Sequence, residues 1–223
     1  MAKPRLLDLF CGAGGAAMGY YRAGFEVVGV DIKPQKHYPF EFHQADALTY
    51  PLEGFDAYHA SPPCQRWTGL QDVTKKHTGK DVGLNHPDYI VPIRERFEAI
   101  GRPYVIENVT KCKPLRTMII LCGASLGLRN IQRHRHFESN VMMFQPKCSH
   151  TKESQIFGVY GALDGRVVFK RKEYRATYAA KGIEHARQLL AIDWMDDGEI
   201  QQAIPPCYTE YIGKYLMQAV LNR

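Results

Sequence analysis

The chain has 223 residues, of which 45% are hydrophobic and 23% charged, and its formal net charge is +6. This size allows one core-bearing domain with a small appendage, and the composition is that of a globular protein. The charge is compatible with a polyanionic partner. No apolar run approaches the ~18 residues of a membrane span. Because the first residues also lack the pattern of an export signal, we expect a cytoplasmic protein that does not bind a membrane.

The first half of the sequence alternates strand-like and helix-like pieces. Strands are predicted over 4–10, 25–31, 44–48, 55–61 and 103–109, with helices over 16–24 and 90–101. This alternation predicts an α/β fold with a Rossmann-like, mostly parallel sheet flanked by helices. Ligands of such sheets gather at the carboxyl ends of the strands. The chemically informative residues fall at or just after such ends: Asp8, Asp31, Asp46, Cys64 and Glu107.

The pattern changes after about residue 140. The following segment is basic, aromatic and punctuated by glycine, with short strand-like pieces such as RVVFKR at 166–171. It predicts a small, basic α+β lobe. Two helices are then expected, over 182–195 and 208–223, and the second closes the chain back onto the first domain.

The stretch DLFCGAGG, residues 8–15, follows a strand and opens a helix. Its glycines permit close backbone approach to a ligand, and the helix N-terminus can receive an anion. Asp31 ends the next strand, where a ribose diol is held in related sheets, and Asp46 is placed to accept an exocyclic amine. A plain glycine-rich turn and two surface acids are the alternative. The three features in this order favour an adenosine-bearing cofactor.

Two prolines precede Cys64 in the stretch SPPCQRW, and they restrict the backbone that presents its thiol. A thiolate is a strong nucleophile, but it needs cations or donors nearby to form at neutral pH. Glu107 offers a carboxyl group that can hold a proton when desolvated. Arg133 and Arg135, two residues apart, share one face if they lie on a strand. The alternatives are an inert buried cysteine, a structural acid and a solvated basic edge.

The six cysteines form no paired framework, and we expect them to be reduced thiols. CSH at 148–150 and HRH at 134–136 contain residue types that ligate zinc, but no CxxC motif accompanies them. We therefore expect no metal site. A metal protein using Cys148 and His150 remains the least favoured alternative.

Taken together, DLFCGAGG, GVD, QADA, SPPCQRW, IENV and QRHRHFE resemble the DNA cytosine-5 methyltransferases. The resemblance spans residues 5–138 and resumes at AIPPCYTEYIG, 203–213. It implies a class I methyltransferase fold, with a catalytic domain formed by residues 1–138 and 196–223 and a target-recognition segment at 139–195. The implied cofactor is S-adenosyl-L-methionine, and the implied partner is double-stranded DNA.

The resemblance also implies a role for each matching residue. Cys64 attacks C6 of a cytosine flipped out of the duplex, Glu107 holds the N3 edge, Arg135 contacts O2, and Arg133 supports Cys64. Asp31 binds the ribose and Asp46 the adenine amine. The full implied cofactor site is Asp8, Phe10, Cys11, Gly12, Ala13, Gly14, Asp31, Ile32, Asp46, Ala47 and Pro62. The implied substrate contacts are Pro63, Gln65, Asn108, Val109, Lys170, Arg171 and Lys172, the last three to phosphates.

Three departures from the family pattern bear on these expectations. Ile131 stands where the family has glutamine, Gln201 and Gln202 replace Gly-Asn, and the recognition segment is short. The short segment predicts a short or loosely read target and a solitary enzyme, monomeric, from a bacterial or phage-infected cell. The altered last motif leaves open an enzyme that modifies RNA or transfers another group. A catalytically silent DNA-binding relative is the remaining alternative.

Overall fold

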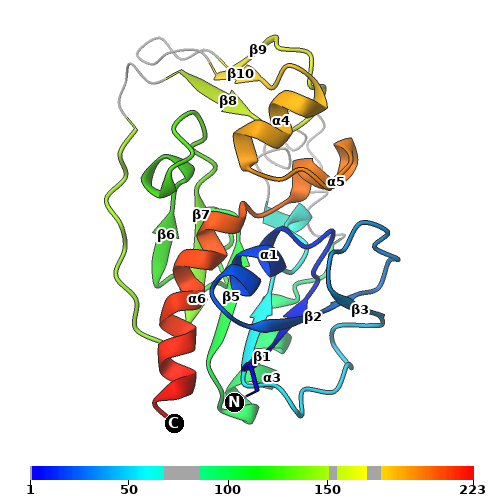
Figure 1. The fold of residues 1–223 in the computed structure, drawn as a ribbon, viewed down its shortest axis with the longest axis vertical. Coiled ribbons are helices and arrows are strands. Elements are labelled where there is room, and N and C mark those ends of the chain that lie inside the picture. Colours follow the sequence, from blue (N-terminus) through cyan, green and yellow to red (C-terminus); the bar gives the residue numbers. More distant parts are fainter. Residues whose placement is uncertain (1, 68–85, 151–154, 170–176) are drawn as a thin grey trace.

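The structure is a computed structural model that describes residues 2–67, 86–150, 155–169 and 177–223. Its main element is a seven-stranded sheet in the order β3-β2-β1-β4-β5-β7-β6 (Figure 1). The first five strands pair in parallel, and β7 runs antiparallel to both β5 and β6. The strands are β1 (Arg5–Leu9), β2 (Glu26–Asp31), β3 (Glu41–Gln44), β4 (Ala57–Ala60), β5 (Tyr104–Asn108), β6 (Ile119–Leu121) and β7 (Arg135–Ser139). The predicted mostly parallel α/β sheet is confirmed.

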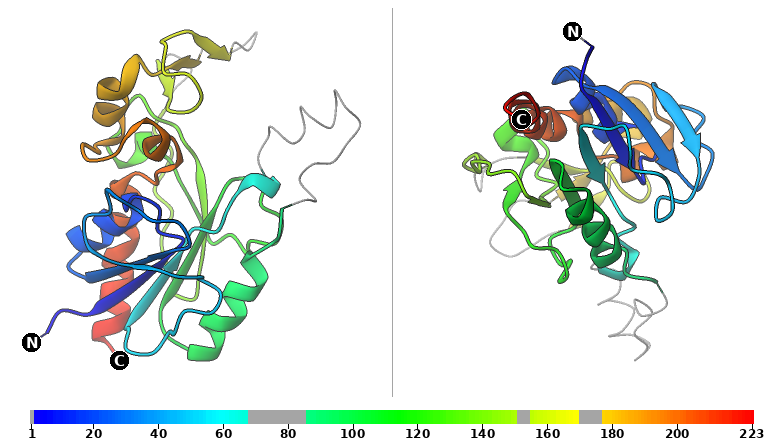
Figure 2. Two further views of the ribbon diagram at one scale, coloured as in Figure 1. Left: turned by 90° about the vertical axis from the view of Figure 1, so that its right-hand side faces the viewer. Right: turned by 90° about the horizontal axis from the view of Figure 1, so that it is seen from below.

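Helices cover both faces of this sheet, because alternate strand residues point to opposite sides. Leu6 packs with α1 (Gly15–Arg22) and α6 (Pro206–Leu221), whereas its neighbour Leu7 packs with α3 (Ile90–Ile100). Figure 2 shows α1 and α6 on one side of the sheet and α3 on the other. Strands buried on both faces need continuous apolar runs, and RLLDL and EVVGVD supply them.

The antiparallel strand β7 is tied to α3 by a buried ion pair. The guanidinium of Arg94 binds both carboxylate oxygens of Glu138, and the backbone N–H of Arg116 donates to one of them at 2.6 Å. Both side chains are about 95% buried, with exposures of 5% and 3%. A pair this buried is stable only when its remaining lone pairs are also satisfied, as they are here.

A second sheet, in the order β8-β10-β9, lies beyond the carboxyl ends of the parallel strands (Figure 1). It consists of β8 (Ile156–Gly158), β9 (Val167–Phe169) and β10 (Thr177–Ala179), and α4 (Gly182–Leu190) and α5 (Asp197–Gln202) follow. The sheet and α4 lie within 139–195, the segment predicted as a lobe. Their core is shared with Ala13 and Ile131 of the first half. The domain bounds remain a prediction.

Two predicted elements are placed differently. The helix expected over 182–195 ends at Leu190, because Ala191 adopts a left-handed conformation with φ 55°. The third strand lies over Glu41–Gln44 rather than 44–48, and Asp46 therefore stands in the turn after it. Lys170, Arg171 and Lys172, predicted to contact phosphates, lie outside the described residues.

Candidate active site

The carboxyl ends of β1, β2, β4 and β5 open into a cavity of about 560 Å³. It receives residues from both predicted groups, those expected to hold a cofactor and those expected to react with a base. The predicted residues that line it are Asp8, Phe10, Cys11, Gly12, Ala13, Asp31, Ile32, Asp46, Ala47, Pro62, Pro63, Cys64, Gln65, Glu107, Val109 and Arg135. Gly14, Arg133 and Asn108 do not line it.

The glycine loop is held against the end of β2 by Asp31. One carboxylate oxygen of Asp31 accepts from the backbone N–H of Gly12 at 3.1 Å, and the other accepts from the backbone N–H of Lys33 at 3.0 Å. Phe10 and Gly12 both adopt positive φ, 57° and 49°, so the loop turns sharply away from β1. Positive φ in a non-glycine residue such as Phe10 is strained and occurs mainly at functional sites.

Gly14, the next glycine of the loop, is the N-cap residue of α1 and does not line the cavity. Its φ is 84°, and a Cβ on it would lie 2.7 Å from Pro39 and 3.0 Å from Tyr38. Gly12 differs, because no atom lies within 4 Å of the position its Cβ would take. The loop therefore leaves space beside Gly12 for a ligand to approach the backbone closely.

Asp8 lies beneath the loop and is fully buried. Neither of its carboxylate oxygens has a hydrogen-bond partner among the described residues. Burial, and secondarily the nearby Asp31 carboxylate, raise the pKa of Asp8 well above its ordinary value. A buried carboxyl without partners is costly, and a cavity-facing one is best satisfied by a ligand that brings hydrogen-bond donors or positive charge.

An aromatic pair lines the same cavity as Asp46. The rings of Phe10 and Tyr89 lie 5.7 Å apart, tilted by 31°. Asp46 accepts from the backbone N–H of Leu48 at 2.9 Å, and the side chain of Ile32 is 66% exposed. These surfaces suit a flat, partly polar ring. Tyr89 was missed by the sequence analysis, and the only signal for it is an aromatic residue directly before a helix.

The thiol loop follows β4 and is anchored by Asn108. Its side-chain amide donates to the carbonyl of Pro62 at 2.9 Å, and its oxygen accepts from the Val109 N–H at 2.9 Å. A turn closes after the thiol, where Trp67 N–H donates to the Cys64 carbonyl at 2.8 Å. Asn108 is 1% exposed. Its bonds differ from the predicted substrate contact, because the amide is used to hold the proline that precedes the thiol.

Cys64, Glu107 and Arg135 meet in the same part of the cavity. Arg135 Nε lies 3.1 Å from Glu107 Oε1, and the two side chains are 19% and 6% exposed. Burial raises the pKa of Glu107, against the lowering effects of Arg135, Arg133 and a hydrogen bond with Ser61. A carboxyl with a raised pKa is suited to hold a proton toward a ring nitrogen.

The Cys64 thiol is not activated in the free protein. Burial is the largest cause that raises its pKa, the Glu107 carboxylate is the second, and the arginines Arg135 and Arg133 only partly offset them. The cations that the sequence analysis required are present. However, the negative charge of Glu107 opposes them, so neutralising Glu107 would shift the balance toward the thiolate.

Arg133 and Arg135 do not lie on the same strand, so the condition under which they would share one face is not met. Strand β7 begins at Arg135, and Arg133 lies before it with φ 31°. The Arg133 guanidinium donates to the carbonyls of Val159 at 3.1 Å and Gln201 at 2.6 Å. Burial, and then the charge of Arg135, lower its pKa. Arg133 therefore links the residue after β8 to α5, and its charge is one of the causes that lower the pKa of Cys64.

The remaining wall of the cavity comes from the segment after α4, which the sequence analysis did not assign to the site. Trp194 Nε1 donates to the carbonyl of Ala13 at 2.8 Å. The Glu199 carboxylate lies 2.8 Å from His37 Nδ1, within hydrogen-bond distance. The only sequence signal was the departure at Gln201 and Gln202. The wall residues from this segment are Met195, Gly198, Glu199, Gln201, Gln202, Ala203 and Ile204.

Comparisons with known proteins give the class of fold. No protein-family model and no curated protein sequence matches the chain. Among solved structures, a putative DNA modification methyltransferase encoded within an E. coli prophage is 16% identical, with a TM-score of 0.63 over 99% of this chain and 100% of that one. Entamoeba histolytica methyltransferase EhMeth is 12% identical, with a TM-score of 0.60 over 98% of this chain and 99% of that one.

A Spodoptera frugiperda DNMT2 mutant is 11% identical, with a TM-score of 0.60 over 96% of this chain and 99% of that one. At these identities the likeness establishes the fold, which is that of class I methyltransferases, over nearly the whole chain.

Within the described ranges, no helix has the length and apolar character needed to cross a membrane.

Proposed function

We propose that the protein transfers a methyl group from S-adenosyl-L-methionine to C5 of a cytosine in double-stranded DNA, through a covalent bond between Cys64 and C6. The observation that carries this proposal is that Cys64, Glu107 and Arg135 share one cavity with the Gly12 loop. One wall of the cavity therefore suits a nucleoside cofactor, and the adjoining wall carries a nucleophile, a proton donor and a cation. The solved methyltransferase structures with the same fold support this proposal.

The residues at the glycine loop fit S-adenosyl-L-methionine. Asp8 offers a buried carboxyl without a partner, and the space beside Gly12 admits a ligand to the backbone. Asp31 would hold the ribose hydroxyls, and Phe10 with Tyr89 would border the adenine, since all three line the cavity. When bound, the cofactor supplies an electrophilic methyl group on a sulfonium centre.

The chain's own residues prepare the base for this transfer. Glu107 donates its proton toward N3, which makes C6 electron-poor, and Arg135 stabilises the oxygen at C2. While Glu107 holds this proton it carries no negative charge, so one cause of the raised Cys64 pKa is absent. The Cys64 thiol then loses its proton and its sulfur forms a bond to C6, which places an electron pair on C5. After C5 takes the methyl group, its proton leaves to solvent, the S–C6 bond breaks and the thiolate is released.

A direct test uses S-adenosyl-L-methionine with a tritiated methyl group and mixed-sequence duplex DNA or RNA, with Cys64→Ala and Cys207→Ala beside the wild type. Cys207 lies in α6 and does not line the cavity. We expect label in 5-methylcytosine from DNA with the wild type and Cys207→Ala, and a loss of at least about 10³-fold with Cys64→Ala. Label in RNA alone would replace DNA as substrate. Label that survives in Cys64→Ala would contradict the covalent mechanism.

A further inference from the structure

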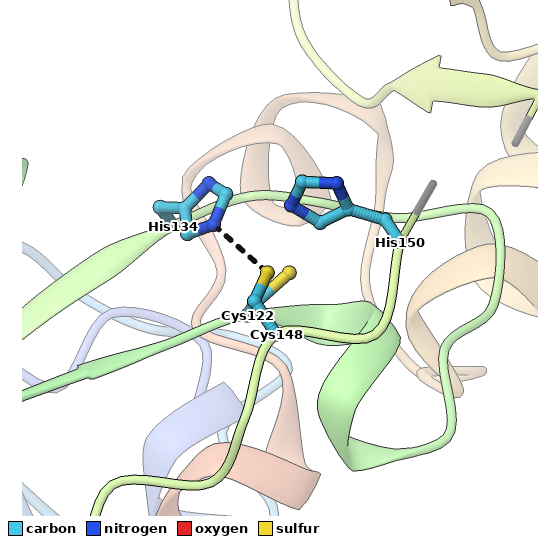
Figure 3. A group of neighbouring side chains, drawn as sticks. All are labelled: Cys122, His134, Cys148 and His150. Carbon is cyan, nitrogen blue, oxygen red and sulfur yellow. Dashed lines mark hydrogen bonds between the residues drawn. The ribbon is translucent and has the colours of Figure 1, made fainter. Parts of the chain in front are cut away.

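Four metal-ligating side chains from three separate segments converge outside the cavity (Figure 3). Cys122 directly follows β6, His134 directly precedes β7, and Cys148 and His150 stand on the segment after β7. One sulfur or nitrogen atom from each lies within 4.8 Å of all the others. Because the three segments are separated in sequence, no common zinc-binding motif contains all four residues, and only the fold brings them together.

The geometry fits tetrahedral zinc. Cys148 Sγ lies 3.4 Å from His134 Nε2. With zinc–sulfur bonds of about 2.3 Å and zinc–nitrogen bonds of about 2.0 Å, ideal tetrahedral ligand atoms lie about 3.3–3.8 Å apart. The His134 and His150 rings meet at 80° with centroids 5.4 Å apart, so they are not stacked. In Figure 3 both rings direct a nitrogen toward the two sulfurs.

One ligand atom is left without a partner in the free protein. His150 Nε2 is buried, and among the described residues it has no hydrogen-bond partner. An unsatisfied buried ring nitrogen costs stability unless a bound ion or water occupies the space it faces. Two thiolates and two neutral imidazoles also supply the charge and softness that match a divalent zinc ion.

The backbone around these side chains is already ordered by hydrogen bonds. Ser149 Oγ donates to the Ala124 carbonyl at 2.7 Å, which holds the Cys148–His150 segment against the turn after β6. The backbone N–H of Gly123 donates to the carbonyl of Gln132 at 3.0 Å, which holds that turn against the segment before β7. The ligands therefore lie on a framework that needs little rearrangement to bind a metal.

We propose that Cys122, His134, Cys148 and His150 form a four-coordinate structural zinc site. Four protein ligands leave no open position for a reacting water, as in structural rather than catalytic zinc sites. His134 lies between Arg133 and Arg135, so the zinc fixes the segment that presents both guanidinium groups. It also fastens the chain leading to the second sheet onto the end of β6 (Figure 1).

The first test measures bound metal in matched variants. Protein purified without chelator and dialysed against metal-free buffer is analysed for zinc per chain by mass spectrometry. His134→Ala is compared with His136→Ala, which changes the next histidine of the same segment, and Cys148→Ser is compared with Cys207→Ser. We expect about one zinc per chain in the wild type and both controls, and at most about a tenth of that in His134→Ala and Cys148→Ser.

The second test identifies the ligands by cobalt substitution, which needs no enzymatic activity. Cobalt(II) bound by two thiolates in a tetrahedral site gives intense visible and thiolate-to-metal absorption bands, and we expect these in the wild type and His136→Ala but not in Cys148→Ser. A wild type that purifies without zinc and gives no such bands with cobalt(II) would overturn the site, as would peptide masses that show a Cys122–Cys148 disulfide under reducing conditions. Absent methyl transfer with zinc retained would instead count against the proposed function alone.

Discussion

The two sides of the cavity are held in place by different interactions. On the glycine-loop side, the hydrogen-bond donors are neutral: backbone N–H groups bind Asp31, Trp194 binds the Ala13 carbonyl, and α1 packs closely on α6. On the thiol side, Glu107 and Arg135 form an ion pair in a buried setting, and Arg133 donates to carbonyls of two distant segments. The first side is therefore held by packing and neutral donors, whereas the second is held by charged side chains.

The largest effects are expected where charge is removed from the thiol side. Glu107→Gln should lower methyl transfer by about 10²–10⁴-fold, because the proton donor is lost. It should at the same time make the Cys64 thiol more reactive, because the carboxylate that raises its pKa is gone. Arg135→Gln should also lower transfer but should make the thiol less reactive. Rates of Cys64 alkylation against pH measure both shifts.

These opposite shifts separate an electrostatic role from a general disturbance of the site. Alkylation is followed by mass spectrometry of the peptide that contains Cys64, so the other cysteines do not interfere. Cys64→Ala provides the blank. Equal changes in alkylation rate for both variants would show that the thiol responds to packing rather than to charge, and the proposed link between Glu107 and Cys64 would fail.

On the glycine-loop side, the large effects should be on stability. A Cβ on Gly19 would lie 2.1 Å from the Pro206 carbonyl oxygen and 2.1 Å from Thr209 Oγ1, so Gly19→Ala must push α1 away from α6. We expect a loss of roughly 2–4 kcal/mol in the free energy of unfolding. Gly12→Ala meets no atom and bears only the strain of φ 49°, about 1–2 kcal/mol. Urea denaturation of both variants measures the difference, and equal losses would contradict the packing argument.

The glycine-loop side could largely be predicted from the sequence because its interactions are local to strand ends. An apolar run followed by DLFCGAGG fixes where β1 stops and α1 begins, and an acid at the end of β2 must then lie beside that loop. Cys64 and Glu107 lie near the same sheet edge as expected, since Cys64 follows the parallel strand β4 and Glu107 lies near the end of β5. Spacing along the chain is sufficient wherever the sheet itself brings residues together.

The thiol side could be predicted only in part, because its supports come from distant segments. Nothing in the sequence shows that Arg133 leaves the strand and binds Val159 and Gln201, or that Asn108 is used to hold Pro62. The zinc ligands proposed above follow the same rule. The four ligands are spread over 28 positions, from Cys122 to His150, and none belongs to a CxxC motif. A search for that motif therefore misses the site that the folded chain assembles.

The pH dependence of stability tests a buried histidine of β4, the strand that leads to the thiol loop. His59 is buried and contacts Tyr20 Oη at 2.9 Å and Ser61 Oγ at 2.8 Å, and burial lowers its pKa to about 3. Between pH 6.5 and 3 the unfolded chain binds a proton at this histidine and the folded chain does not. The free energy of unfolding should therefore fall as pH falls through this window, by up to about 1.4 kcal/mol per pH unit.

Other groups titrate in the same window, so the difference between variants is the informative quantity. His59→Phe removes this titration, and its stability should depend less steeply on pH than that of the wild type. His43→Gln, which changes an exposed histidine of β3 and keeps His59, is the matched control. Parallel slopes for the wild type and His59→Phe, measured by denaturation at a series of pH values, would mean that His59 is solvated.

The smallest expected effect distinguishes the two sides through their tryptophans. Trp194→Phe removes the 2.8 Å hydrogen bond to the Ala13 carbonyl and keeps most of the ring's apolar contact. Such a bond contributes about 0.5–1.5 kcal/mol, so calorimetry should show S-adenosylhomocysteine binding about 2- to 12-fold more weakly. Trp67→Phe, beside the thiol loop, should leave this affinity unchanged. The weaker binding is expected because Trp194 holds the glycine loop in the conformation that the ligand contacts. An equal loss of S-adenosylhomocysteine affinity in Trp194→Phe and Trp67→Phe would mean that the thiol side also holds the ligand.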